Sequence, residues 1–173
     1  MHRELKPTTS AEGLRIGLVV SRYHAPITDA LRDGAVDCYT RAGGSADDLV
    51  VVNAPGTFEV TALCAALAER GDLDAVVAVG CVISGQTTHD QYLCQAVSHG
   101  LTEVSLRTGV PVSFGVLTCQ SLEQAEARAG GDRGNKGAEA MAAAIETART
   151  IRGLRDAPCP RPANVGHHRG GAP

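Results

Sequence analysis

The densest group of chemically useful side chains directly follows the most apolar run of the sequence. It reads Gly85-Gln86-Thr87-Thr88-His89, and a helical pattern begins at its end. The glycine permits a turn, after which backbone amides and hydroxyls stand at a helix N-terminus, a favourable place for an anion such as phosphate. A histidine beside that place is suited to carrying protons near neutral pH. The same residues fit a capping turn with a surface histidine, and the segment alone leaves both interpretations open.

A second polar segment, NAPGTFE, follows another apolar run. Pro55 and Gly56 favour a bend, and Glu59 then falls in the first turn of the next helix. The helix dipole stabilises a carboxylate at that position, which gives a purely structural reason for it. The carboxylate can equally accept hydrogen bonds from a polyol.

A third stretch, RAGGDRGNKG at residues 128–137, is rich in glycine and has a lysine before a helix. It lacks the Gly-Lys-Ser/Thr order and the preceding strand of a nucleotide-binding P-loop. Arg128 and Lys136 therefore either clamp a phosphate or are simply solvated. His89 and His99 are too far apart on one helix to share a metal as residues i and i+4 would. These patterns predict acid–base chemistry on a small phosphorylated molecule, without a metal or a bound cofactor.

The elements that would position these residues alternate along the chain. Strands are expected at residues 14–21, 49–53, 75–83 and 110–118, whose nearly unbroken apolar character is typical of a parallel sheet buried on both faces. Helices are expected at residues 28–42, 57–70, 88–108, 121–129 and 136–154. This alternation predicts an α/β protein, a three-layer α/β/α sandwich around a four-stranded parallel sheet. Ligands bind at the carboxyl ends of such strands, so the four segments that follow them should converge on one edge.

Composition narrows the class of protein further. The 173 residues suit one domain, and a net charge of −3 with scattered basic residues argues against a nucleic-acid partner. No apolar run approaches the roughly 18 residues that cross a bilayer, so we expect no membrane association and a cytoplasmic protein. The six cysteines include no C-x-x-C pair. Five are predicted to be small buried hydrophobes, and Cys159 a free thiol in the tail.

The chain divides into three predicted parts. Residues 1–13 form an irregular N-terminal arm, residues 14–155 the single folded domain, and residues 156–173 a disordered tail rich in proline and glycine. The adjacent His167 and His168 lie in that tail and are expected to be solvated.

Six segments, in this order and spacing, resemble the lumazine synthase family. They are SRYHAPIT, NAPGTFEV, LDAVVAVGCVISGQTTHDQYLCQAVSHGL, GVPVSFGVLT, EQAEARAG and GNKGAEA, within residues 14–152. The resemblance implies a flavodoxin-like sheet. It also implies a transferase of riboflavin biosynthesis that condenses 5-amino-6-(ribitylamino)uracil with 3,4-dihydroxy-2-butanone 4-phosphate to give 6,7-dimethyl-8-ribityllumazine, phosphate and water. The family needs neither a metal nor an organic cofactor.

The resemblance also implies roles for individual residues. His89 matches the proton-transfer histidine, and Arg128 the phosphate-binding arginine. Tyr23 would stack on the pyrimidine, and Glu59 would bind the ribityl chain. The implied substrate-binding residues are Tyr23, Thr57, Phe58, Glu59, Val82, Ile83, Gln86, Thr87, Phe114 and Lys136. Of these, Gln86 and Thr87 match the phosphate-binding turn, and Phe114 and Lys136 reach the pocket from an adjacent subunit.

The chain departs from the family pattern at four positions. Ser84 stands where Arg is usual, His24 where Asn is common, Thr57 where Ala is found, and Asp90 where an aromatic residue is frequent. These departures keep two other interpretations open, a non-catalytic shell paralogue that binds flavins or lumazines and a riboflavin synthase of the archaeal type. The family forms homo-oligomers, either pentamers or 60-subunit icosahedral shells, and the short link from Arg128 to Gly137 makes a shell possible here.

Overall fold

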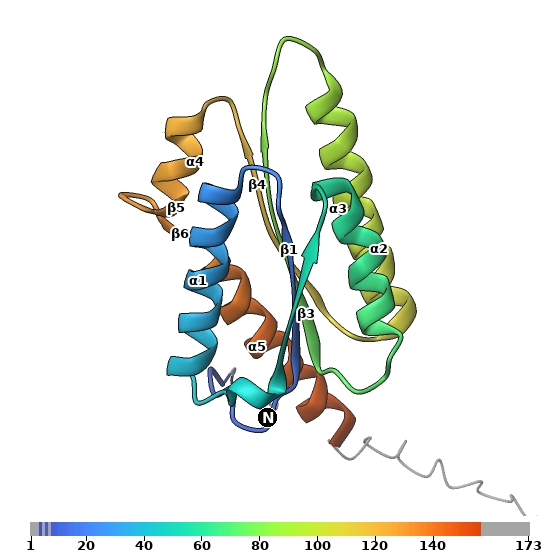
Figure 1. Ribbon diagram of the computed structural model, residues 1–173. Helices are drawn as coiled ribbons and strands as arrows, with labels where there is room; N and C mark the ends of the chain where they lie inside the picture. The colour runs from blue at the N-terminus through green and yellow to red at the C-terminus, as the bar shows by residue number, and fades with distance from the viewer. Residues whose placement is uncertain (1–3, 5, 7, 157–173) are drawn as a thin grey trace, which may run out of the picture.

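The computed structural model describes residues 4, 6 and 8–156. Strands and helices alternate along the chain, as Figure 1 shows. The strands are β1 (Ile16–Ser21), β2 (Leu49–Ala54), β3 (Ala75–Ile83), β4 (Val112–Cys119), β5 (Ala129–Gly131) and β6 (Gly134–Asn135). The helices are α1 (Ala25–Arg41), α2 (Thr57–Ala68), α3 (His89–Thr108), α4 (Leu122–Arg128) and α5 (Lys136–Asp156), and a 3₁₀ turn, η1 (Ala46–Asp48), precedes β2.

The four long strands form one parallel sheet in the order β2-β1-β3-β4. Residues Ala75 to Val82 of β3 are all buried, which explains why its sequence is apolar without alternation. This strand order is that of flavodoxin-like folds without their last strand. From β1 the chain adds β2 on one side of the sheet and then β3 and β4 on the other side. At such a change of side, a crevice is expected beyond the carboxyl ends of β1 and β3.

Helices cover both faces of the sheet, as predicted from the sequence. In Figure 1, α1, α4 and α5 lie on one side of the strands and α2 and α3 on the other. The side chains of β3 alternate between the two cores, because successive residues of a strand point to opposite faces. Val77 packs with Leu31 and Met141 on the first side. Val76 packs with Val60 on the second. The three-layer α/β/α fold is therefore confirmed.

The junction between α1 and α5 explains the glycine-rich GNKG sequence. Asn135 Oδ1 accepts hydrogen bonds from the backbone N–H of Gly137 and of Ala138, at 2.9 and 3.0 Å, and so caps the start of α5. Its side-chain amide donates to the carbonyl of Ala30 in α1 at 2.8 Å. A Cβ at Gly137 would lie 2.0 Å from the carbonyl oxygen of Leu31. These residues therefore serve close packing between the two helices.

The boundaries predicted from the sequence need small corrections. Helix α1 begins at Ala25, earlier than expected, because Pro26 lies in its first turn, where proline is tolerated. Ser121 caps α4 as predicted, accepting a hydrogen bond from the amide of Gln124. The hairpin of β5 and β6 was not predicted, since two strands of two or three residues leave no periodic pattern.

The structure describes only part of the predicted division into an N-terminal arm, a folded domain and a C-terminal tail. In the N-terminal segment, the backbone amide of the fully buried Ala11 donates to the carbonyl of Ala42 at 2.8 Å. Helix α5 continues to Asp156, and the rest of the predicted tail, with Cys159, His167 and His168, lies outside the described residues. A search of the described residues for a helix both long and apolar enough to cross a bilayer finds none.

Candidate active site

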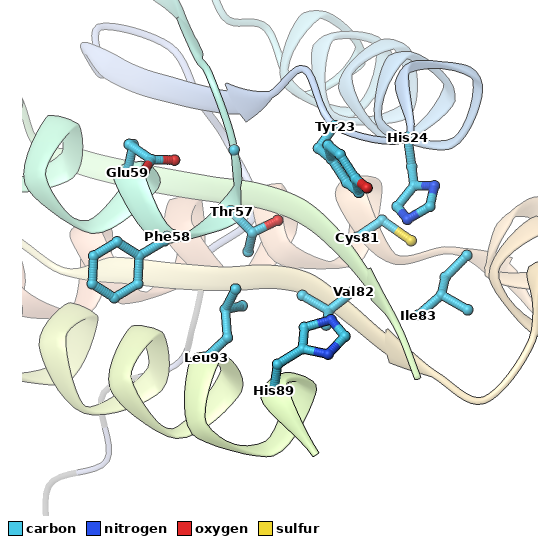
Figure 2. A pocket seen from close by; sticks show the side chains of 11 residues that line it. Tyr23, His24, Thr57, Phe58, Glu59, Cys81, Val82, Ile83, His89 and Leu93 are labelled. Atoms are coloured by element: carbon cyan, nitrogen blue, oxygen red, sulfur yellow. The ribbon is translucent and has the colours of Figure 1, made fainter. Parts of the chain in front are cut away.

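A pocket of about 290 Å³ opens at the carboxyl end of the sheet, where β1, β2 and β3 lead into their helices. Figure 2 shows its side chains, which come from the starts of α1, α2 and α3 and from the end of β3. The lining residues are Tyr23, His24, Gly56, Thr57, Phe58, Glu59, Cys81, Val82, Ile83, His89 and Leu93. A largely apolar cavity with a few polar groups is suited to a small ring-containing ligand.

The start of α1 contributes an aromatic pair. Tyr23 is 66% exposed, so a face of its ring is accessible for stacking. His24 meets this ring edge to face, with centroids 4.7 Å apart and an interplanar angle of 77°. Among the described residues, His24 is the one non-glycine residue with positive φ, at 59°. This left-handed conformation is uncommon outside glycine, and such strain often marks a functional position.

The start of α2 contributes a carboxylate and a second ring. Thr57, the first residue of α2, is buried, and its hydroxyl donates to Ser21 Oγ at 3.5 Å. A Cβ at Gly56 would lie 2.9 Å from Glu59 Oε2, so the glycine leaves room for the carboxylate. Phe58 is 60% exposed and lies between Thr57 and Glu59 on the wall of the pocket.

The turn between β3 and α3 carries the polar segment Gly85-Gln86-Thr87-Thr88-His89. Its backbone is anchored to the sheet, since the amide of Ser84 donates to the carbonyl of Cys119 at 2.8 Å. His89 is the first residue of α3 and lines the pocket. Its Nδ1 lies 2.6 Å from the hydroxyl of Thr87. Because this contact engages Nδ1, the other ring nitrogen, Nε2, is the one left for a ligand.

The same turn holds a carboxylate next to the histidine. The hydroxyl of Ser84 donates to Asp90 Oδ2 at 2.6 Å. This hydrogen bond is the main reason why the pKa of Asp90 lies below its ordinary value, with smaller contributions from backbone amides and from the positive charge of His89. Gln86 and Thr87 are exposed on the turn and do not line the pocket.

Three of the predicted site residues lie in a second pocket, of about 390 Å³, formed by β4, α4 and α5. Phe114 is 46% exposed on β4, one of the two edge strands of the sheet. Lys136 pairs with Glu139 at 2.6 Å. Arg128 donates to the carbonyl of Gln124 at 3.0 Å and is not among the arginines that pair with carboxylates in the described part of the chain. This pocket therefore offers a guanidinium available to an anion.

The four segments lie at one edge of the parallel sheet, as expected, but they do not share one pocket. The segments after β1, β2 and β3 meet in the first pocket, whereas Thr118 and Cys119 of the fourth segment line the second. The reason is topological, because β4 lies on the side of β3 away from β1, and its chain turns into α4, on the face opposite α2 and α3. Within one chain, His89 and Arg128 thus line different pockets.

Comparison with known proteins identifies the family. The family model described as 6,7-dimethyl-8-ribityllumazine synthase matches residues 13–152. The chain belongs to this family. It is 45% identical over 146 residues to the 6,7-dimethyl-8-ribityllumazine synthase of Aquifex aeolicus, covering 84% of this chain and 95% of the relative. It is 48% identical over 135 residues to that of Porphyromonas gingivalis, covering 78% and 84%. The Thermus thermophilus protein of the same name is 41% identical over 152 residues, covering 88% and 97%.

The lumazine synthase resemblance drawn from six motifs is therefore confirmed. The predicted site list missed four residues that line the pocket, His24, Gly56, Cys81 and Leu93. Cys81 and Ile83 are two residues apart on β3 and so share a face, and Leu93 is one helical turn after His89, so both signals were present in the sequence. The conformation of His24 has no sequence signal. Burial raises the pKa of Cys81 to about 12, so it contributes to this lumazine synthase pocket as a neutral thiol.

The prediction of five buried cysteines is only partly right. Cys64, Cys81 and Cys119 are buried, whereas Cys38 and Cys94 are half-buried on helices α1 and α3.

Proposed function

We propose that this chain catalyses the condensation of 5-amino-6-(ribitylamino)uracil with 3,4-dihydroxy-2-butanone 4-phosphate, giving 6,7-dimethyl-8-ribityllumazine, phosphate and water. The observation that carries this proposal is the match over residues 13–152 to a family whose members are named for that product. The pocket agrees with the chemistry, since it combines aromatic and apolar walls with one carboxylate and two histidines.

In this proposal the first pocket binds the pyrimidine. Tyr23 stacks on the ring, and Val82 and Ile83 supply apolar contact from the end of β3. The exposed carboxylate of Glu59 accepts hydrogen bonds from the ribityl hydroxyls. Thr57 and Phe58 complete the wall on the α2 side.

The turn and the second pocket bind the phosphorylated ketone. Gln86 and Thr87 present polar groups beside the N-terminus of α3, and Arg128 supplies the positive charge. The amine attacks the ketone carbonyl and water leaves, forming an imine. Phosphate is then eliminated, and the ribityl-bearing nitrogen closes the ring with loss of a further water. His89, oriented by Thr87, moves the protons that these steps require.

A complete site in this proposal needs a second copy of the chain. His89 and Arg128 line different pockets of one chain, so a neighbour brings its Phe114, Arg128 and Lys136 to the first pocket. Such a contact joins two different surfaces, and repeated contacts of this kind close into a ring. We propose a homo-oligomer, a pentamer or a 60-subunit shell. Bringing two reactants together at the interface makes their reaction effectively unimolecular.

A cytoplasmic location stays a prediction.

Mixing the two substrates with the purified protein tests the activity. We expect lumazine absorbance to appear together with an equal amount of inorganic phosphate, since one phosphate leaves for each ring closed. The control omits the phosphorylated ketone and supplies lumazine alone, which a riboflavin synthase would consume. Absence of both lumazine and phosphate with the full substrate pair contradicts the proposed enzyme and favours a carrier of flavins or lumazines.

Mixing two inactive variants tests whether sites lie between chains. We expect His89→Ala and Arg128→Ala each to lose most activity alone. A co-assembled equal mixture should recover about a quarter of the wild-type activity, because about half of the sites have an intact His89 and about half of those have a neighbour with an intact Arg128. Each variant refolded with itself is the control. Light scattering on the same samples gives the assembly, with a pentamer near five times the 17.9 kDa chain. Absence of recovery in the co-assembled mixture argues against a shared site.

A further inference from the structure

The turn that bears the predicted phosphate-binding and proton-transfer residues is joined at its two ends by a side-chain hydrogen bond. Ser84, the residue after β3, donates its hydroxyl to Asp90 Oδ2, in the first turn of α3, at 2.6 Å. The backbone amide of Ser84 is itself bonded to the carbonyl of Cys119 on β4. The start of the turn is thus bonded to the sheet through the Ser84 amide, and the end of the turn is bonded to its start through Asp90.

The residues between these ends have few other restraints. Residues 85–89 are all exposed, and Thr88 makes no side-chain hydrogen bond as the cap of α3. The contact between Thr87 and His89 lies within the turn and does not fix it to the rest of the chain. An exposed segment of this kind samples several conformations unless its ends are held. The bond between Ser84 and Asp90 is the side-chain contact that joins these ends directly.

We propose that Ser84 and Asp90 form a clasp that positions residues 85–89 for phosphate binding and proton transfer. Both are positioning residues, since neither lines the pocket. This inference rests on the proposed function of the turn. It also gives a role to two positions at which the chain departs from the pattern of its family, because Ser84 and Asp90 are bonded to each other.

The placement of Asp90 has an electrostatic cost as well as a benefit. A carboxylate in the first turn of a helix is stabilised by the helix dipole, but it occupies the region that favours an incoming anion. The titratable groups that face Asp90 are His89 and Cys94. Removing the charge while keeping the hydrogen bond therefore separates the two effects. Asp90→Asn does this, since its amide oxygen still accepts from the serine hydroxyl.

Steady-state kinetics of five variants test the clasp. We expect Ser84→Ala and Asp90→Ala each to raise the KM for the phosphorylated ketone about three- to ten-fold, the effect of losing one charge-assisted hydrogen bond. The KM for the ribitylaminouracil and the melting temperature should stay unchanged. Ser84→Thr keeps the hydroxyl and should restore the KM. Asp90→Asn should stay close to wild type. The double variant Ser84→Ala/Asp90→Ala should be no worse than either single variant, because both remove the same interaction.

Hydrogen exchange of the peptide that covers residues 84–90 tests the clasp independently of activity. We expect faster exchange in Ser84→Ala than in wild type. The matched control is Ser98→Ala on α3, whose hydroxyl bonds only to the carbonyl of Gln95 in its own helix. The control should leave both exchange and KM unchanged.

The outcomes separate this inference from the proposed function. If wild type turns over both substrates while Ser84→Ala has wild-type KM and exchange, the clasp is refuted and the function stands. Effects that multiply in the double variant also refute it, since they show independent roles. If wild type does not turn over, the proposed function fails, and the exchange experiment still decides whether the clasp orders the turn.

Discussion

Replacing Arg128 by alanine raises the KM for the phosphorylated ketone by about ten- to a hundred-fold, which is the expected loss when a charged hydrogen-bond donor to a phosphate is removed. Arg128 is half-buried and lines the second pocket. Its guanidinium has no carboxylate partner in the described part of the chain, so its charge is not already neutralised. Steady-state kinetics with each substrate varied in turn measure the effect. The KM for the ribitylaminouracil should change little, because the two substrates contact different groups in the proposed site.

The neighbouring Arg133 provides the matched control. It follows the same helix, its side chain is 70% exposed, and it lies 3.9 Å from Asp132. Arg133→Ala removes the same kind of charge from the hairpin that follows α4 and should leave both KM values within two-fold of wild type, as expected for an exposed ion pair. Equal kinetics for Arg128→Ala and wild type would show that phosphate is bound elsewhere.

Replacing Gly137 by alanine destabilises the fold by about 3 kcal/mol, the upper range for forcing an extra carbon into a packed interior. The new Cβ would lie 2.0 Å from the carbonyl oxygen of Leu31 and 2.7 Å from its carbonyl carbon, so α5 must move away from α1. Backbone atoms cannot turn aside as a flexible side chain can. For a chain of this size the loss corresponds to a decrease of roughly 6 to 12 °C in melting temperature, measured by circular dichroism at fixed protein concentration.

The same helix contains the control for this prediction. A Cβ at Gly153 meets no atom within 4 Å. Gly153→Ala should therefore stabilise α5 by up to about 1 kcal/mol, because alanine is the better helix former. If Gly137→Ala has the same melting temperature as the wild type, the close approach of α5 to α1 is not a constraint on the fold.

The residues of the site could largely be predicted from the sequence, but only part of their arrangement in space could. The apolar run of β3 and the glycine after it marked where the strand ends, so His89 and the turn were found from local pattern alone. Glu59 was singled out by its position at the start of a helix, whereas Val82 and Ile83 came from the family resemblance. Their grouping in one pocket also depends on the strand order, which local patterns do not encode.

The sequence by itself determined the alternation of strands and helices, because periodicity and turn residues act over a few neighbours. It therefore determined which residues stand at the carboxyl ends of the strands. Tertiary structure decided which of these share a pocket, since β4 lies on the side of β3 away from β1 and leads to Arg128 on a different surface from His89. It also decided the left-handed conformation of His24, the contact of Gly137 with Leu31 and the bond between Ser84 and Asp90. Each of these depends on distances that exist only once the chain has folded.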